Sequence, residues 1–261
     1  MIHITRPNPV PHCLVTRGVD KTKLDCDEYD VCPDDYRLGR KLLNAFDRNI
    51  YADPSVKAAL YGAHHGKCCY CEMKYAPAYL HVEHFRPKSG IRQRRNQKDD
   101  HPGYYWLAYV WENLLLACHQ CNSVQKKTLF PLANPSVRPA GALSHHYDIS
   151  LEEPLLIDPA TDEPRDHIQF EGSSPKGLTP HGRTTIRELG LRKSTIAREK
   201  RMVKHKHLRM CLGIVEAHQN DPTNPTLRRL VIQARKDLTV ATKPEAEFSS
   251  MAQDLLRGWR P

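Results

Sequence analysis

Apolar residues recur at helical spacing in the first quarter of the chain. Residues 34–51 show this spacing clearly, which predicts one helix there, with an aspartate after Pro33 capping its start. A second helix is predicted from Pro54 to His64, and residues 1–32, rich in prolines and mixed charges, predict an irregular arm. The apolar positions of the first helix are Leu38, Leu42, Leu43, Phe46 and Ile50.

The centre of the chain, from about Gly66 to Leu132, is dense in aromatic residues. Within it, residues 81–88 alternate between apolar and polar side chains, which predicts a short strand. A polar stretch near 89–103 contains glycine, aspartate and proline and predicts a loop.

Residues 133–182 contain many prolines and glycines, so loops are expected there, with short strands at 155–157 and 167–170. Helical spacing returns from 184 to 218, with a break at Gly190. Two more helices are expected, around 225–239 and 244–257. The predicted fold class is therefore α+β, with an N-terminal arm and helices over 1–64, a small metal-bearing core over 65–135, and a loop-rich and then helical region over 136–261.

The length and hydropathy exclude several classes of protein. The longest apolar run, Tyr104–Trp111, has eight residues, far below the ~18 that a membrane span needs. The first residues show no charged segment followed by an apolar stretch, so we expect no secretory signal and a cytoplasmic location.

The charge balance favours a polyanionic partner, because 39 basic against 30 acidic residues give a net charge of +9. Much of the surplus lies between Arg183 and Arg209, which contains ten Lys or Arg and two Glu. We expect this stretch to contact nucleic acid or to dock a partner protein, and a solvated helix face is the alternative. Residues spaced three or four apart would form one stripe on a helix, and these are Arg198, Arg201, His205 and Arg209.

Four of the nine cysteines form two C-x-x-C pairs. Two intervening residues let both thiolates approach one ion from a tight turn, and two such turns complete a tetrahedral zinc site. In a reducing compartment, paired cysteines bind metal more often than each other. We expect a structural Zn²⁺ held by Cys68, Cys71, Cys118 and Cys121. Cys69 could replace Cys68, and His119 lies near enough to compete. The remaining cysteines show no shared spacing and are expected to have no role: Cys13, Cys26, Cys32, Cys69 and Cys211.

The residues between and beside these cysteines suit phosphodiester hydrolysis. A neutral imidazole such as that of His84 can remove a proton from water near pH 7. The carboxylate of Glu83 and the amide oxygen of Asn122 are hard ligands suited to Mg²⁺, which can polarise a phosphate. Lysine and arginine side chains nearby can hold the phosphate backbone.

The order C-x-x-C, Glu-His, Asn and C-x-x-C-Asn resembles the HNH endonuclease family in its form with zinc knuckles. That family builds a ββα-metal unit around one catalytic divalent ion. The resemblance implies that His84 is the general base, that Asn113 orients the catalytic loop, and that Glu83 and Asn122 bind catalytic Mg²⁺ or Mn²⁺. The expected nucleic-acid contacts are Arg86, Lys88, Lys126, Arg198 and Arg201.

A narrower resemblance covers about residues 65–209. The segments CCYCE, HVEHFRPK, YYWLAYVWENLLLACHQCN and KKTLFPL are similar to the Septu-type anti-phage HNH endonucleases, the PtuB group, which also occurs with retrons. EEPLLIDPATDEPRDHIQF and TTIRELGLRKSTIAREKR are similar to that group as well. The resemblance implies a DNA endonuclease of bacterial defence that acts with an ATPase partner of the PtuA type. The alternatives are an RNase acting on tRNA, a non-catalytic zinc module that binds nucleic acid, and a subunit whose catalytic site is vestigial.

Overall fold

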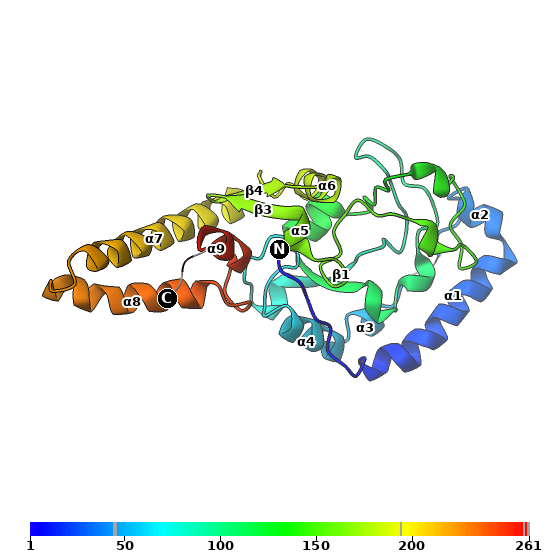
Figure 1. Cartoon of the computed structure of the whole chain (residues 1–261). Coiled ribbons are helices and arrows are strands. Elements are labelled where there is room, and N and C mark those ends of the chain that lie inside the picture. Colours follow the sequence, from blue (N-terminus) through cyan, green and yellow to red (C-terminus); the bar gives the residue numbers. More distant parts are fainter. Residues whose placement is uncertain (44–45, 194, 258, 260–261) are drawn as a thin grey trace.

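The computed structural model describes residues 1–43, 46–193, 195–257 and 259, with the backbone alone at 195. Helices and two small sheets alternate along the chain (Figure 1), which confirms the α+β class. Short 3₁₀ turns connect them at Pro77–Tyr79, Tyr105–Leu107, Trp111–Asn113, Pro135–Val137 and Ile149–Leu151. No helix of the described residues is long and apolar enough to cross a membrane.

The N-terminal segment is more regular than the sequence predicts. A π-helical turn, Leu14–Gly18, leads into α1 (Val19–Val31), so an irregular arm over 1–32 is wrong for its second half. The apolar face of α1 is short, and its weak amphipathicity explains why the pattern did not reveal it. Tyr29 of α1 is buried against Tyr36 and Tyr105, which attaches the helix to the body.

The single helix predicted over 34–51 is also wrong. The chain forms α2 (Pro33–Arg37) and, separately, α3 (Arg48–Tyr51). Gly39 between them has a φ of 65°, a left-handed conformation that ends the first helix. Leu43 and Ile50 are buried in different apolar clusters, which the interruption allows.

The predicted helix at 54–64 is confirmed as α4 (Pro54–Ala63), and Asp53 caps its start by accepting a hydrogen bond from the backbone N–H of Ser55. Val56 and Leu60 of this helix are fully buried. α4 packs against β2, the second strand of the central sheet.

The central sheet has two antiparallel strands, β1 (Leu80–His84) and β2 (Leu114–Cys118), with His84 opposite Leu114. The strand predicted within 81–88 is thus confirmed. Every residue of β2 is buried, which explains its continuous apolar sequence. A seven-residue π-helical segment, η5 (Gln120–Lys126), follows β2 directly.

The second sheet pairs β3 (Ile168–Glu171) with β4 (Ser174–Gly177), which confirms the strand predicted at 167–170. No strand forms at 155–157, so that prediction is wrong. Ile157 is buried and its N–H binds the hydroxyl of Thr185 rather than a neighbouring strand. A short helix, α5 (Pro164–His167), precedes β3.

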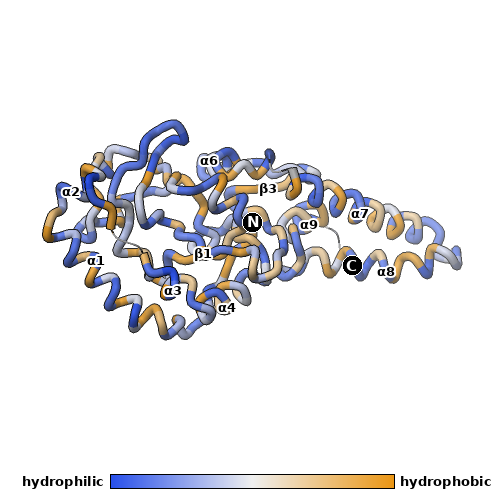
Figure 2. The backbone as a smooth tube through the Cα atoms, turned by 180° about the vertical axis from the view of Figure 1, so that it is seen from behind, coloured by the Kyte–Doolittle hydropathy of each residue, from blue (hydrophilic) through white to orange (hydrophobic). Residues whose placement is uncertain are grey.

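The predicted C-terminal helices are confirmed as α6 (Pro180–Glu188), α7 (Thr195–Asn220), α8 (Pro225–Ala241) and α9 (Ser249–Leu255). Gly190, with a φ of 59°, separates α6 from α7. α7 and α8 form a long hairpin that projects from the body (Figure 1), and both alternate between apolar and polar residues (Figure 2). Among the described residues, one large core runs through the body, from Met1 to Met251. Smaller apolar clusters lie within the hairpin and α9 and around Tyr29 of α1.

Candidate functional site

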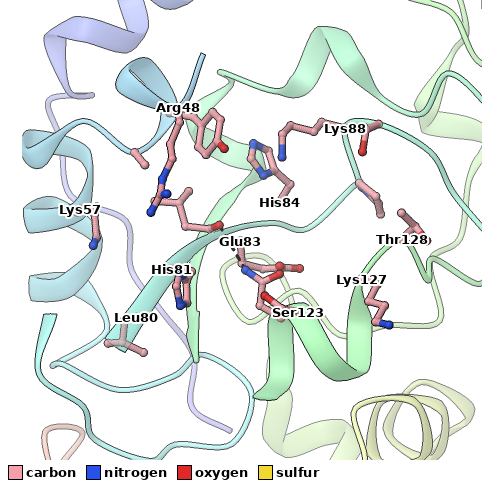
Figure 3. A pocket seen from close by; sticks show the side chains of 16 residues that line it. Arg48, Lys57, Leu80, His81, Glu83, His84, Lys88, Ser123, Lys127 and Thr128 are labelled. Atoms are coloured by element: carbon pink, nitrogen blue, oxygen red, sulfur yellow. Dashed lines mark hydrogen bonds between the residues drawn. The ribbon is translucent and has the colours of Figure 1, made fainter. Parts of the chain in front are cut away.

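A cavity of about 330 Å³ lies beside β1, between α3, α4 and η5. Glu83, His84 and Asn122 line it together, although Asn122 lies far along the chain from the other two. Figure 3 shows four cationic side chains around Glu83 and His84, contributed by different segments of the chain. These cations are Arg48, Lys57, Lys88 and Lys127.

His84 is held in one tautomer. Its Nε2 lies 2.9 Å from the backbone carbonyl oxygen of Ala108. Because a carbonyl oxygen can only accept, Nε2 carries the proton, and Nδ1 of the neutral ring is left as a proton acceptor. Burial, with a further contribution from the charge of Lys88, holds the pKa of His84 well below its ordinary value. The ring is therefore neutral at pH 7, with Nδ1 as its acceptor atom.

Glu83 is a buried carboxylate with a buried cation beside it. Lys126 Nζ lies 2.7 Å from Oε1 of Glu83 and also donates to the backbone carbonyl of His84, at 2.8 Å. Tyr70 donates to the same carboxylate oxygen at 3.4 Å. Burial raises the pKa of the Glu83 carboxyl, and Lys126 opposes that shift. Among the described residues nothing donates to Oε2, so one carboxylate oxygen remains for another ligand.

Asn122 projects from η5 toward β1. Its Nδ2 donates to the backbone carbonyl of Val82 at 3.4 Å, a long hydrogen bond. No described residue donates to its Oδ1. The cavity thus brings together a carboxylate oxygen, an amide oxygen and an imidazole nitrogen that are all unoccupied by the described part of the chain.

Asn113 lies outside this cavity and holds the adjoining backbone together. Its Oδ1 accepts from the N–H of Arg86 at 2.8 Å, and its Nδ2 donates to the carbonyls of Arg86 and Leu107 at 3.0 and 3.1 Å. The segment that follows His84 is thereby tied to the loop that carries Ala108, the acceptor of the His84 ring. These contacts make Asn113 a positioning residue.

Replacing Asn113 is expected to affect stability as well as the cavity. Asn113→Ala leaves buried backbone groups without partners, each of which costs about 1–3 kcal/mol, so we expect a loss of roughly 2–4 kcal/mol in the free energy of unfolding. Chemical denaturation measures this loss. Asn96→Ala, in an exposed loop, is the matched control and should change stability by less than about 0.5 kcal/mol. Equal stabilities of the two variants would contradict the positioning role.

The four predicted zinc ligands converge in the structure. The Sγ atoms of Cys68, Cys71, Cys118 and Cys121 all lie within 4.8 Å of one another, and all four residues are buried. Cys71 and Cys118 are 3.9 Å apart at sulfur, too far for a disulfide at about 2.05 Å. Four thiolates about 2.3 Å from a zinc ion would stand about 3.8 Å apart. The cluster could therefore hold a metal ion such as zinc.

The predicted nucleic-acid contacts fall into two groups. Lys88 lines the cavity, and Arg198 is exposed on α7. The other three are already engaged within the protein. Arg86 forms an ion pair with Glu152, Lys126 is buried against Glu83, and Arg201 is buried with its guanidinium donating to the carbonyls of Ser173 and Leu191. The predicted stripe on α7 is therefore wrong at Arg201, which faces the body.

Sequence reasoning missed several residues of the cavity. Arg48 and Lys57 come from α3 and α4, which carry no motif, and Tyr51 packs edge-on against the His84 ring, with centroids 4.9 Å apart. Lys127, next to the predicted Lys126, and His81, in the segment HVEHFRPK, lay where the sequence gives a visible signal. The others become recognisable only when the helices pack against β1.

Comparison with known proteins finds relatives of this chain. Over 127 residues the chain is 43% identical to Septu protein PtuB of Bacillus mycoides (strain KBAB4), covering 48% of this chain and 42% of that protein. It is 25% identical over 266 residues to Septu protein PtuB of Bacillus thuringiensis, covering 98% of this chain and 82% of the relative. Homologues of this chain are thus named Septu protein PtuB. The predicted resemblance to the PtuB group is confirmed.

A further similarity involves a PtuA protein. Septu protein PtuA of the same B. mycoides strain is 29% identical over 109 residues, which are 41% of this chain and 15% of that protein. No family model matches the chain, and no solved structure matches it either.

Proposed function

We propose that the chain is a metal-dependent endonuclease of the HNH type that hydrolyses phosphodiester bonds of DNA. The observation that carries the proposal is the neutral His84 ring, with Nδ1 left as acceptor, in one cavity with Glu83 and Asn122. The proposal takes β1, β2 and η5 as the ββα-metal unit and the four cysteines as a zinc site that braces it.

The donors present fit a divalent cation. Glu83 offers one carboxylate oxygen and Asn122 one amide oxygen, and Mg²⁺ or Mn²⁺ prefers such ligands together with waters. When bound, the ion would polarise the scissile phosphate and stabilise the leaving oxygen. Lys126 favours the ionised form of Glu83, which burial alone would disfavour.

The protein's own side chains supply the proton transfer and the phosphate contacts. Nδ1 of His84 removes a proton from the attacking water. The imidazolium that forms is stabilised by its hydrogen bond to the Ala108 carbonyl, which also fixes the ring. Lys88 and Lys127, with Arg48 and Lys57, hold the phosphates of the strand on both sides of the cavity.

The names of the relatives give the biological setting. One PtuB relative aligns with nearly the whole chain. The PtuA relative bears the name of the same Septu system. We therefore assign the chain to a Septu-type anti-phage system of the bacterial cytoplasm, with a PtuA-like ATPase as its partner.

A nicking assay tests the activity. Supercoiled plasmid and a labelled tRNA are incubated with the purified chain, alone and together with its PtuA-like partner and ATP, in Mg²⁺, Mn²⁺ or EDTA. We expect nicking of the plasmid that requires the divalent ion. Binding of either nucleic acid without cleavage under any condition supports a non-catalytic module instead, and cleavage of tRNA alone supports an RNase.

The metal ligands make a separate prediction. Glu83→Gln and Asn122→Ala should raise the Mg²⁺ concentration needed for half-maximal nicking by at least about tenfold, because even outer-shell partners of a metal contribute 10–100-fold to its affinity. Added Mn²⁺ should restore part of the rate. Val124→Ala, exposed on the same η5 segment, is the control and should leave the Mg²⁺ dependence unchanged. Unaltered Mg²⁺ dependence in both ligand variants would contradict the assignment.

A further inference from the structure

A group of ligand-type side chains lies in the α7–α8 hairpin, far along the chain from the cavity. His207 and Cys211 are one turn apart on α7, and Asp237 faces them from α8. Their ligand atoms all lie within 4.8 Å of one another. His207 Nε2 is 3.0 Å from Oδ2 of Asp237 and 3.6 Å from Sγ of Cys211. The imidazole nitrogen therefore faces both a thiol and a carboxylate.

The surroundings of this group suit a bound ion. Cys211 is only 2% exposed and belongs to the apolar cluster of the hairpin. The side chains of His207 and Asp237 are 46% and 30% exposed, so solvent reaches the group from one side. Gln233 donates to the other carboxylate oxygen of Asp237 at 2.6 Å. Such an outer hydrogen bond orients a carboxylate ligand.

We propose that His207, Cys211 and Asp237 form a zinc site, with a fourth position open to water. In a tetrahedral zinc site, a thiolate sulfur and an imidazole nitrogen stand about 3.5 Å apart, and a nitrogen and a carboxylate oxygen about 3.3 Å apart. The distances of 3.6 and 3.0 Å are close to both values. A set of one thiolate, one imidazole and one carboxylate favours zinc over Mg²⁺ or Ca²⁺.

Zinc would change the state of the thiol and the stability of the hairpin. Burial raises the pKa of Cys211, so the thiol keeps its proton in the absence of an ion. When Zn²⁺ binds, the S–H proton is released to solvent and a sulfur–zinc bond forms. Because two ligands come from α7 and one from α8, the ion would join the helices, and its binding free energy would add to the stability of the hairpin.

Without an ion, the three side chains make separate contacts. The His207–Asp237 pair across two helices is an ordinary surface pair worth little. Cys211 is a core residue whose sulfur also lies within hydrogen-bond distance of His207 Nε2, at 3.6 Å. A metal ligand set accounts for all three side chains at once.

Metal analysis of matched variants tests the proposal. The full chain is expressed with zinc, dialysed against zinc-free buffer and analysed for zinc per chain by mass spectrometry. His207→Ala and Cys211→Ala should each bind one ion fewer than the wild type. His218→Ala removes a histidine of the same helix outside the group and should keep the wild-type content. The result is the difference in zinc content per chain between the wild type and each variant. Ions bound at the four cysteines, or at Asp30, His145 and His146, contribute equally to all the proteins and do not affect that difference.

Two further measurements keep the test decisive if a variant folds poorly. Asp237→Asn preserves the size of the side chain and should still lower the zinc content by one ion. After removal of weakly bound metal, added Zn²⁺ should raise the unfolding temperature of the wild type but not that of Asp237→Asn. Equal zinc contents in the wild type and all three ligand variants would overturn the proposal, as would the loss of an ion from His218→Ala.

Discussion

His84→Ala is expected to lower the rate of DNA cleavage by about 10²–10⁴-fold, the contribution that a general base typically makes. The reason lies in the tautomer: the hydrogen bond to the Ala108 carbonyl leaves Nδ1 as the proton acceptor, and burial keeps the ring neutral. Single-turnover nicking of plasmid at saturating enzyme and Mg²⁺ measures the effect without a contribution from binding.

A second variant separates chemistry from packing. His84 is buried against Tyr51, so removing the ring leaves a cavity. His84→Gln fills more of that space and can still donate to a carbonyl, but its amide cannot act as a base. Both variants should bind plasmid as tightly as the wild type and should not be rescued by Mn²⁺. His12→Ala, at an exposed position, is the control for histidine replacement. A cleavage rate of His84→Gln near that of the wild type would contradict the assignment of His84 as the general base.

Cys118→Ala is expected to unfold the core of the protein. Zinc bound at structural sites contributes an apparent ~10–16 kcal/mol, which is comparable to the whole stability of a typical domain, ~5–15 kcal/mol. Cys118 is the last residue of β2, opposite Leu80 of β1, so the loss of the ion would loosen the sheet that carries Glu83 and His84. Calorimetry and circular dichroism measure the loss of the cooperative transition.

The control for this variant is another buried cysteine of the same core. Cys13 lies outside the four-cysteine cluster, with Sγ 3.9 Å from the carbonyl of Ile50. Cys13→Ala should keep its zinc and lose only about 1 kcal/mol. If Cys118→Ala keeps both its zinc and its unfolding temperature, the four cysteines are not a structural metal site.

Local patterns predicted the parts of the site that lie close together in the sequence. Cys68 and Cys71 lie at a turn, whereas Cys118 ends β2 and Cys121 lies in η5. The C-x-x-C spacing keeps the two cysteines of each pair close together, and the four sulfurs converge in the structure. Glu83 and His84 are neighbours at the end of a strand whose sequence alternates between apolar and polar residues. The long amphipathic helices α7 and α8 were equally visible, because a period of 3.6 residues persists over many turns.

Other predictions failed where a pattern was short or where a tertiary contact decided the outcome. The apolar positions of 34–51 fit a helix, yet Gly39 takes a left-handed conformation, and Leu38 and Leu42 are exposed. Leu156 and Ile157 are buried without forming a strand, and the N–H of Ile157 donates to the hydroxyl of Thr185 instead of to a neighbouring strand.

The sequence by itself determined the chemistry available to this protein: a zinc-type set of cysteines, a base beside an acid, and a surplus of positive charge. The tertiary structure alone decided which cations are free. Arg86, Lys126 and Arg201 look alike in the sequence, but each is buried or paired, whereas Arg48 and Lys57 face the cavity. The physical reason is that spacing along the chain determines only which residues are neighbours within one helical turn or one strand. The partner of a charged side chain depends instead on which distant segments pack against it.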